Sequence, residues 1–265
     1  MALWTLTGLL KGKATTAWPK KDEDGQDGLF GMPRYDQQAC RDGCSECSAI
    51  CPTGAIRLGA EGQRLELDYG RCVVCQLCTE VCPTGAMARS ADWAFGVRHR
   101  QDLRTNATAA CRSDAAPSQV GRRAFRRSLH VRHVDSGSCN GCESELQALN
   151  NPFYNLHRFG IFFTPSPRFA DLLLVTGPVT RAMEEPLRAT YDAMPLPRWV
   201  MATGTCAVSG GIAAGGYACG HGLEEVLPVD LYLPGCPPNP AAMIEALLMF
   251  LDRMPQRVKG GRIGQ

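Results

Sequence analysis

Hydrophobic and polar positions divide the second half of the chain into strands and helices. Residues 129–135 (LHVRHVD) alternate as in a half-buried strand, and residues 171–176 (DLLLVT) form the unbroken apolar run of a buried parallel strand. Strands alternating with helices are typical of a parallel sheet with helices on its faces. The pattern therefore predicts an α/β domain. Its further strands are expected at residues 198–203 and 230–233, and its helices at residues 143–149, 181–192 and 241–253.

The first hundred residues contain an internal repeat in place of such apolar runs. CPTGAI (51–56) recurs as CPTGAM (82–87), an offset of 31 residues. Cys44 and Cys47 recur at the same offset, whereas Cys40 recurs after 32, so the first copy has one extra residue. A repeat of about thirty residues with few apolar side chains buries little surface by itself. Bound metal can hold such a unit together.

The second copy of the repeat reads Cys72-x2-Cys75-x2-Cys78-x3-Cys82-Pro, which is the bacterial ferredoxin pattern for a [4Fe–4S] cluster. Three thiolates on one tight loop cap three corners of a cube, and the fourth caps the neighbouring cube. Two interlocked clusters are therefore expected. The first would use Cys40, Cys44, Cys47 and Cys82, and the second Cys72, Cys75, Cys78 and Cys51.

Two alternatives stay open for these eight cysteines. Structural zinc also uses four cysteine ligands for each site, in CxxC pairs that lie well apart. The spacing Cys40-x3-Cys44 departs from the usual x2. Either the loop absorbs the extra residue, or the first cluster is altered or loses one ligand.

Four more cysteines each follow a predicted strand. Cys139 and Cys142 come after residues 129–135, and Cys206 and Cys236 follow the two later strands. The carboxyl ends of parallel strands meet at one edge of a sheet, where binding sites are built. Glycines and prolines surround these cysteines, so the backbone can approach a bulky group. The sequence predicts a third [4Fe–4S] cluster here, and the alternative is four unrelated buried cysteines.

The remaining candidate residues carry weaker signals. Cys111 and Cys219 are expected to be plain thiols, and His221 has no partner at metal-ligand spacing. Glu143 and Glu145 directly follow Cys142. They are either carboxylates favoured by a helix N-terminus or proton-handling groups beside a redox centre.

Composition and charge restrict the class of protein. The chain has 265 residues, and 45% of them are hydrophobic, so it is too large and too apolar to need disulfides as its main source of stability. Its fourteen cysteines are therefore interpreted as metal ligands. The net charge of +2 argues against a nucleic-acid partner. The basic run GRRAFRR (121–127) is interpreted as a solvated linker, a docking strap or a contact to an acidic partner. Neither a stretch of eighteen apolar residues nor a secretory signal is recognised, so a cytoplasmic location is expected.

Five segments carry a family resemblance. They resemble the proximal-cluster subunit shared by [NiFe] hydrogenases and respiratory complex I, over roughly residues 122–255. The family fold is flavodoxin-like, which agrees with the predicted parallel sheet. The segments are SCNGCE (138–143), NPFYNLHRFGI (151–161), DLLLVTGPVT (171–180), GTCAVSGG (204–211) and VDLYLPGCPPNP (229–240).

The resemblance also indicates a branch of the family and a domain order. Complex I subunits have two adjacent cysteines at the first ligand position, whereas this chain has Cys139-x2-Cys142. In this spacing the chain resembles the small subunit of an energy-converting, formate hydrogenlyase-type hydrogenase. GKATTAWP (12–19) and the repeat are similar to the separate two-cluster ferredoxin subunit. The expected domains are therefore a small α+β ferredoxin-like domain at 1–100, with 1–35 as an extension, a basic linker at 101–128 and a flavodoxin-like domain at 129–265.

The function that the resemblance implies is electron transfer through three clusters to or from a Ni–Fe site on a large partner subunit. The chain would be an electron-transfer subunit of an oxidoreductase and contribute no catalytic side chain of its own. Expected partners are the large subunit, membrane-arm subunits, and a ferredoxin-like or formate dehydrogenase component. They would hold the chain peripherally on the inner face of the cell membrane. The segment ALWTLTGLL would pack on membrane subunits or on the ferredoxin-like domain.

Two other functions stay open. One is a complex I-like oxidoreductase whose large subunit lacks Ni–Fe. The other is a binding module that clusters or zinc stabilise without redox chemistry.

Overall fold

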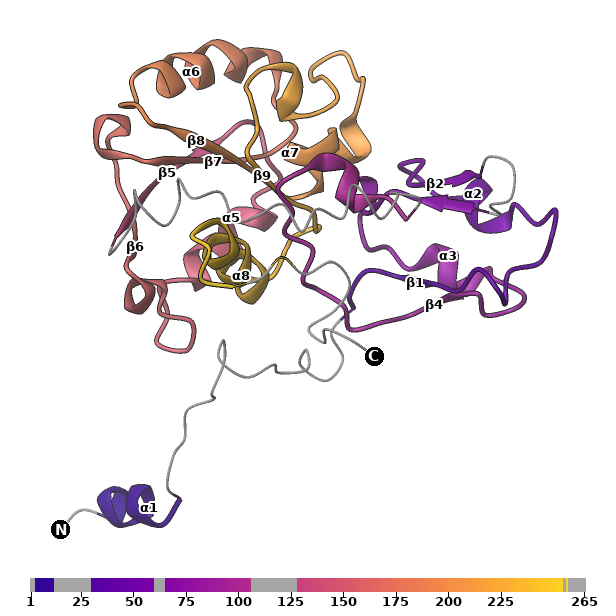
Figure 1. The fold of residues 1–265 in the computed structure, drawn as a ribbon, viewed down its shortest axis with the longest axis horizontal. Coiled ribbons are helices and arrows are strands. Elements are labelled where there is room, and N and C mark those ends of the chain that lie inside the picture. Colours follow the sequence, from indigo (N-terminus) through magenta and orange to yellow (C-terminus); the bar gives the residue numbers. More distant parts are fainter. Residues whose placement is uncertain (1–2, 12–29, 60–64, 106–127, 255, 257–265) are drawn as a thin grey trace.

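The computed structural model describes residues 3–11, 30–59, 65–105, 128–254 and 256, and it forms two lobes joined side by side (Figure 1). The larger lobe contains a five-stranded sheet. The smaller lobe contains two short hairpins and two short helices. Both predicted architectures, the parallel sheet with helices and the ferredoxin-type fold, are confirmed.

The sheet of the larger lobe is parallel throughout, with the strand order β6-β5-β7-β8-β9. Its central strand, β7, is buried at every position because helices cover both faces. The edge strand β6 was not predicted from the sequence. The strands are β5 (Leu129–Asp135), β6 (Ile161–Phe163), β7 (Leu172–Thr176), β8 (Trp199–Thr203) and β9 (Leu231–Leu233).

Two hydrophobic cores lie on the two faces of the sheet. Leu172 and Leu174 of β7 face α5 (Gly141–Ala148) and α8 (Pro240–Phe250), whereas Leu173 and Val175 face the other side. That other side is covered by α6 (Arg181–Asp192) and the short α7 (Thr205–Ser209). The two-residue period of a strand therefore assigns alternate side chains to the two cores. Short 3-10 turns lie at Leu156–Phe159 (η3), Pro167–Phe169 (η4), Gly211–Ala213 (η5) and Leu223–Glu225 (η6).

The smaller lobe is built from two antiparallel strand pairs. β1 (Arg34–Tyr35) pairs with β4 (Met87–Ala88), and β2 (Ile56–Leu58) pairs with β3 (Leu65–Leu67). The helices α2 (Glu46–Ile50) and α3 (Leu77–Glu80) occupy equivalent places in the two copies of the repeat. The turns η1 (Tyr69–Arg71) and η2 (Arg100–Leu103) complete the lobe.

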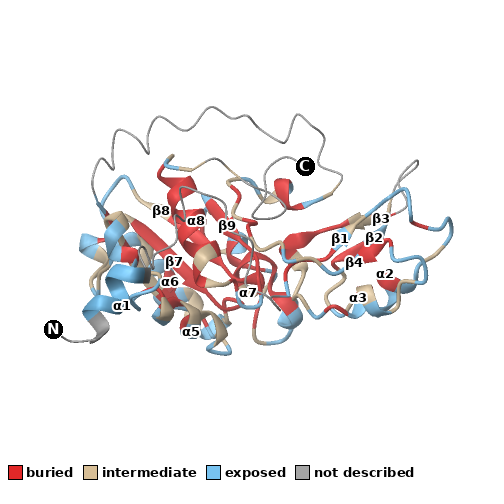
Figure 2. Cartoon of the chain, turned by 90° about the horizontal axis from the view of Figure 1, so that it is seen from below, coloured by how far each residue is buried: buried red, intermediate tan, exposed pale blue. Residues whose placement is uncertain are grey.

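The two lobes share a continuous buried junction. Val97 and Tyr232 of β9 exchange two backbone hydrogen bonds of 2.9 and 2.8 Å, so the chain leaving the smaller lobe runs along the edge strand. Arg98 donates to the carbonyl of Met249 and forms a 2.7 Å ion pair with Asp252. Figure 2 shows buried residues concentrated in β7, β8, β9 and α8.

The structure differs from the expected domain limits at two places. β1 pairs inside the smaller lobe, although residues up to 35 were assigned to an extension. Asp102 and Leu103 are buried, although residue 101 was taken as the start of a linker. In both cases a short segment packs against the ferredoxin-type lobe, and the composition of such a segment does not predict where it packs.

The N-terminal segment forms the helix α1 (Leu3–Lys11), whose described side chains, from Thr5 to Leu10, are exposed. They do not pack on the ferredoxin-type lobe, which was one of the two expectations. Residues 12–19, Cys111 and the basic run 121–127 lie outside the described residues. Within the described part of the chain, we find no helix with the length and hydrophobicity needed to span a bilayer.

Candidate metal centres

The first quartet of cysteines lines one small cavity of the ferredoxin-type lobe. Leu65, Ala86 and Met87 form part of its wall, so the thiols face a mainly apolar space. Three of the cysteines come from the first copy of the repeat and one from the second. They are Cys40, Cys44, Cys47 and Cys82.

The second quartet lines a separate cavity, with Pro33, Ile56 and Leu67 in its wall. Its members come from the two copies in the opposite proportion, as the interlocked spacing predicts. They are Cys51, Cys72, Cys75 and Cys78. Because Cys40, Cys44, Cys47 and Cys82 line one cavity, the extra residue between Cys40 and Cys44 does not separate the thiols of the first quartet.

The electrostatics of the two quartets suit a cationic core. Burial, together with the neighbouring thiols of its quartet, raises the pKa of Cys47 to about 11. Burial likewise raises the pKa of Cys78 to about 11 and that of Cys72 to about 12. Four crowded thiolates repel one another, so a cluster that carries positive charge on its iron atoms is what allows them to ionise together.

Cys82 differs from the other thiols in its quartet. Burial alone would raise its pKa, but hydrogen bonds from the Met87 amide and from Thr84 outweigh burial and lower the pKa. The Met87 amide lies 3.3 Å from the Cys82 sulfur, and the Ala55 amide lies at the same distance from Cys51. Amide donors to sulfur stabilise a cluster thiolate and adjust its potential.

The third quartet converges at the carboxyl ends of three strands of the sheet. Cys139 follows β5, and Cys142 lies in the first turn of α5. Cys206 lies in α7 after β8, and Cys236 follows β9. Burial raises the pKa of Cys142, with Glu143 and the other three thiols adding to it. Burial, Cys236 and Cys139 raise the pKa of Cys206 to about 11.

Two glycines leave space beside these sulfur atoms. A Cβ atom on Gly204 would lie 2.7 Å from the Cys142 sulfur, and one on Gly211 would lie 2.9 Å from the Cys206 sulfur. Both glycines have positive φ angles, of 89° and 58°. Any larger residue at either position would push on a thiol of the quartet. The donor set, the crowding and the cleared space fit a bulky iron–sulfur group.

A hydrogen-bonded network lies behind the third quartet. The Glu143 carboxylate is buried and accepts hydrogen bonds from Ser138, at 2.7 Å, and from Thr176. His133 Nε2 lies 2.9 Å from the Thr176 hydroxyl and 3.7 Å from Glu143. His133 and Glu143 also line an open cleft. Glu143 therefore connects a cysteine loop to a titratable side chain, whereas Glu145 is a carboxyl group whose pKa burial raises.

The other singled-out residues lie outside the three quartets. Cys219 is buried and donates to the Ala213 carbonyl at 2.9 Å, and His221 packs against Gly215.

A zinc ion holds its sulfur ligands at about 2.3 Å. Among the residues that the structure describes, no three Cys, His, Asp or Glu side chains gather closely enough to bind a single metal ion, such as zinc, directly.

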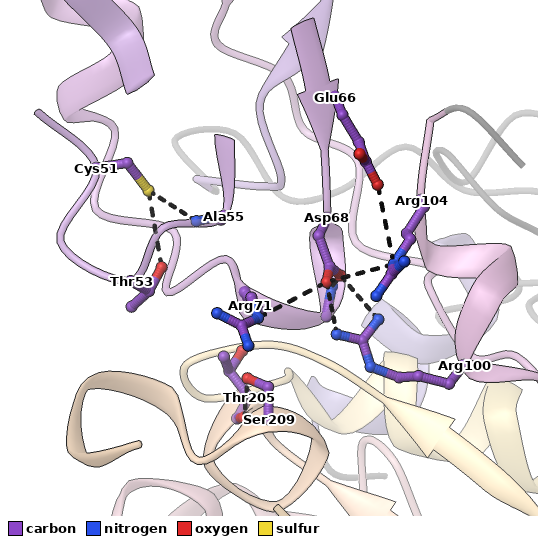
Figure 3. A network of polar contacts seen from close by, with 11 residues as sticks. Cys51, Thr53, Ala55, Glu66, Asp68, Arg71, Arg100, Arg104, Thr205 and Ser209 are labelled. Carbon is purple, nitrogen blue, oxygen red and sulfur yellow. Dashed lines mark hydrogen bonds and ion pairs between the residues drawn. The ribbon is translucent and has the colours of Figure 1, made fainter. Parts of the chain in front are cut away.

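The sequence did not predict the residues that hold η1 within the ferredoxin-type lobe, nor the one that links η1 to the larger lobe (Figure 3). Asp68 forms a bidentate ion pair with Arg100, at 2.7 and 2.8 Å, and lies within 4 Å of Arg71 and Arg104. Beside this network the Thr205 hydroxyl donates to the Cys72 carbonyl at 2.8 Å. Its position before Cys206 is the only signal in the sequence, because the partner lies 133 residues away.

Comparison with known proteins agrees with this geometry. Residues 139–250 match the family model of the NADH ubiquinone oxidoreductase 20 kDa subunit, and residues 39–86 match the 4Fe-4S dicluster domain. Formate hydrogenlyase subunit 7 of Escherichia coli K12 is 44% identical over 134 residues, which are 51% of this chain and 52% of that protein. The probable membrane-bound hydrogenase subunit mbhJ of Pyrococcus furiosus is 41% identical, over 51% of this chain and 80% of the relative.

The chain belongs to the 20 kDa subunit family. Among solved structures, the archaeal membrane-bound sulfane sulfur reductase contains a chain that is 34% identical, with a TM-score of 0.45, over 51% of this chain and 75% of that chain. This member of the 20 kDa family spans about half the length of formate hydrogenlyase subunit 7. It carries a 4Fe-4S dicluster domain in the same polypeptide, so it is an iron–sulfur protein.

Proposed function

We propose that this chain is the electron-transfer subunit of a membrane-associated [NiFe] hydrogenase complex and carries three [4Fe–4S] clusters. The observation that supports this most is the arrangement of twelve cysteines as three quartets. Two quartets line separate cavities of one lobe, and the third meets at the sheet edge of the other lobe. Iron–sulfur clusters exchange single electrons when bound.

The side chains of this protein would hold, insulate and adjust those clusters. The apolar walls around the first two quartets, which include Leu65 and Leu67, exclude water and lower the local dielectric. The Ala55 and Met87 amides donate to the sulfur atoms of Cys51 and Cys82. Gly204 and Gly211 would leave room for the sulfur atoms of Cys142 and Cys206 to hold the third cluster. Hydrogen chemistry would belong to a Ni–Fe site on the large partner subunit.

The hydrogenase branch is proposed on the cysteine spacing and on the relatives. The first ligand position reads Cys139-x2-Cys142. Two relatives above 40% identity are named as a hydrogenlyase subunit and a hydrogenase subunit. Cys139 and Cys236 are exposed, which fits a third site that a partner covers. Membrane-arm subunits and a ferredoxin-like or formate dehydrogenase component would complete the complex, peripherally on the cytoplasmic face of the membrane.

The number of clusters can be tested by elemental analysis of the complex purified without oxygen. Three cubes predict about twelve irons and about twelve sulfides for each copy of this chain, in addition to the iron of the Ni–Fe site and of any iron–sulfur partner in the complex. Cys206→Ser is expected to lose about four of each, because it removes a ligand of the third quartet. Cys219→Ser is the matched control and is expected to retain all of them. Equal iron in the wild type and in Cys206→Ser would contradict a third cluster.

Nickel analysis of the same preparation tests the hydrogenase assignment. Nickel that copurifies with the chain, with hydrogen-dependent reduction of its clusters, supports the proposal. A complex with intact clusters but no nickel would instead be a complex I-like oxidoreductase without a Ni–Fe site. Structural zinc in place of iron would identify a binding module.

A further inference from the structure

Thr205 lies where three cysteine loops meet. It is the first residue of α7 and is 1% exposed. Its hydroxyl donates to the Cys72 carbonyl at 2.8 Å and accepts from the Gly235 amide at 3.1 Å. Thr205 precedes Cys206, and Gly235 precedes Cys236. One hydroxyl group therefore links the backbone of the second quartet to two loops of the third.

The orientation of Thr205 is fixed from several directions. Its amide donates to the Gly235 carbonyl at 2.9 Å, and its carbonyl accepts from the Ser209 hydroxyl at 3.1 Å. The hydroxyl has one proton, which the Cys72 carbonyl uses, so its rotamer is determined. η1, whose C-terminal neighbour is Cys72, lies directly against α7 (Figure 3). The Asp68–Arg100 ion pair holds η1 in place from the other side.

We propose that Thr205 is a positioning residue for electron transfer between the second and the third quartet, an inference that rests on the proposed function. With clusters in both sites, one electron would pass from the site of Cys72 to the site of Cys206. The Cys72 site would be oxidised and the Cys206 site reduced by that one electron, and no bond would be made or broken. The hydroxyl replaces a through-space gap by a hydrogen-bonded contact, and electron coupling through such a contact is stronger than across a gap.

Three variants separate this role from a purely structural one. Thr205→Val keeps the shape but removes both hydroxyl hydrogen bonds, whereas Thr205→Ser keeps the hydroxyl. Ser209→Ala is the matched control, because it removes a hydrogen bond on the same helix that does not reach Cys72. Each variant is prepared as the complete complex, and its iron content is measured first.

Two spectroscopic measurements are then compared at equal iron content. Freeze-quench electron paramagnetic resonance gives the rate at which the third site is reduced after the ferredoxin-type sites, and the same spectra report the magnetic interaction between neighbouring clusters. Thr205→Val is expected to slow the transfer several-fold and to weaken the interaction. Thr205→Ser and Ser209→Ala are expected to retain both.

Each alternative outcome decides the question. A Thr205→Val complex with full iron and the wild-type transfer rate would overturn the inference. A Thr205→Ser complex with a reduced transfer rate would overturn it as well. If Thr205→Val loses iron, the smaller Thr205→Ala replaces it. Iron loss from both would assign the hydroxyl to assembly and overturn a role in transfer. A wild-type complex without a third cluster signal would overturn the proposed function itself.

Discussion

At the scale of single residues, the third quartet depends on side chains that do not contact a metal. Glu143 follows a cysteine in the sequence, and its carboxylate is buried among hydroxyl donors. The sequence left two interpretations of this residue open, and the structure adds His133 and Thr176 as its neighbours. Those two neighbours come from different strands, so no local pattern predicts them.

His133 predicts a dependence of stability on pH. Burial lowers its pKa below the usual 6.5, and Arg132 acts in the same direction, although Glu143 and Asp135 oppose them. The folded protein therefore takes up a proton less readily than the unfolded chain. The contribution of His133 to stability is complete above pH 6.5 and is lost as the pH falls through the lowered pKa.

The measurement is the melting temperature of the wild type and of His133→Gln between pH 7.5 and pH 5. The wild type is expected to lose more stability over this range than the variant, which has no titrating group there. Parallel curves would indicate that His133 titrates alike in both states.

At the scale of elements, α8 is the clearest case of a helix that its sequence determines. Every residue from Ala242 to Phe250 is buried, because the helix lies between the sheet and the segment that leaves the smaller lobe. Apart from Glu245 the helix is apolar on all sides, and such a helix requires a buried place. Asn239 caps it by accepting from the Ala242 amide at 2.7 Å.

Leu247→Ala in α8 is expected to lower the free energy of unfolding by about 2–5 kcal/mol, because Leu247 is fully buried and the truncation leaves a cavity. Leu196→Ala, at a position that is 82% exposed, is expected to change it by less than about 0.5 kcal/mol. Chemical denaturation followed by circular dichroism compares the two. A small effect at Leu247 would mean that the helix packs more loosely than described.

The sequence predicted elements where hydrophobic patterns are long and missed those where they are short. α6 occupies the predicted residues 181–192, and β7 begins one residue after the predicted start. β6 was missed because three apolar residues, Ile161 to Phe163, are too few to distinguish a strand from a helix turn. The quartets themselves follow the spacing and strand ends that the sequence reveals. The Thr205–Cys72 contact depends on how two lobes dock, and no spacing along the chain encodes it.

At the scale of the whole molecule, the network around Asp68 ties the exit segment of the ferredoxin-type lobe to η1. Arg100→Ala would leave the buried Asp68 carboxylate without its bidentate partner, although Arg71 and Arg104 remain within 4 Å. The expected loss of stability is about 3 kcal/mol, at the lower end for breaking a buried ion pair.

The control for Arg100→Ala is Arg89→Ala, which breaks an ion pair to Glu80 that is 56% exposed on both sides. It is expected to cost no more than about 1 kcal/mol. Thermal denaturation and iron release on heating are measured for both variants. If the two variants had the same melting temperature, the Asp68 network would not stabilise the ferredoxin-type lobe.

The pairing of Val97 with Tyr232 has a consequence for how the molecule behaves during synthesis. β9 is the outermost strand of its sheet, and an open strand edge invites pairing with other molecules and aggregation. The chain covers part of that edge with its own backbone. Because one messenger RNA encodes both lobes, the two lobes are produced in equal number. The segment around Val97 is translated before β9, whose edge it protects.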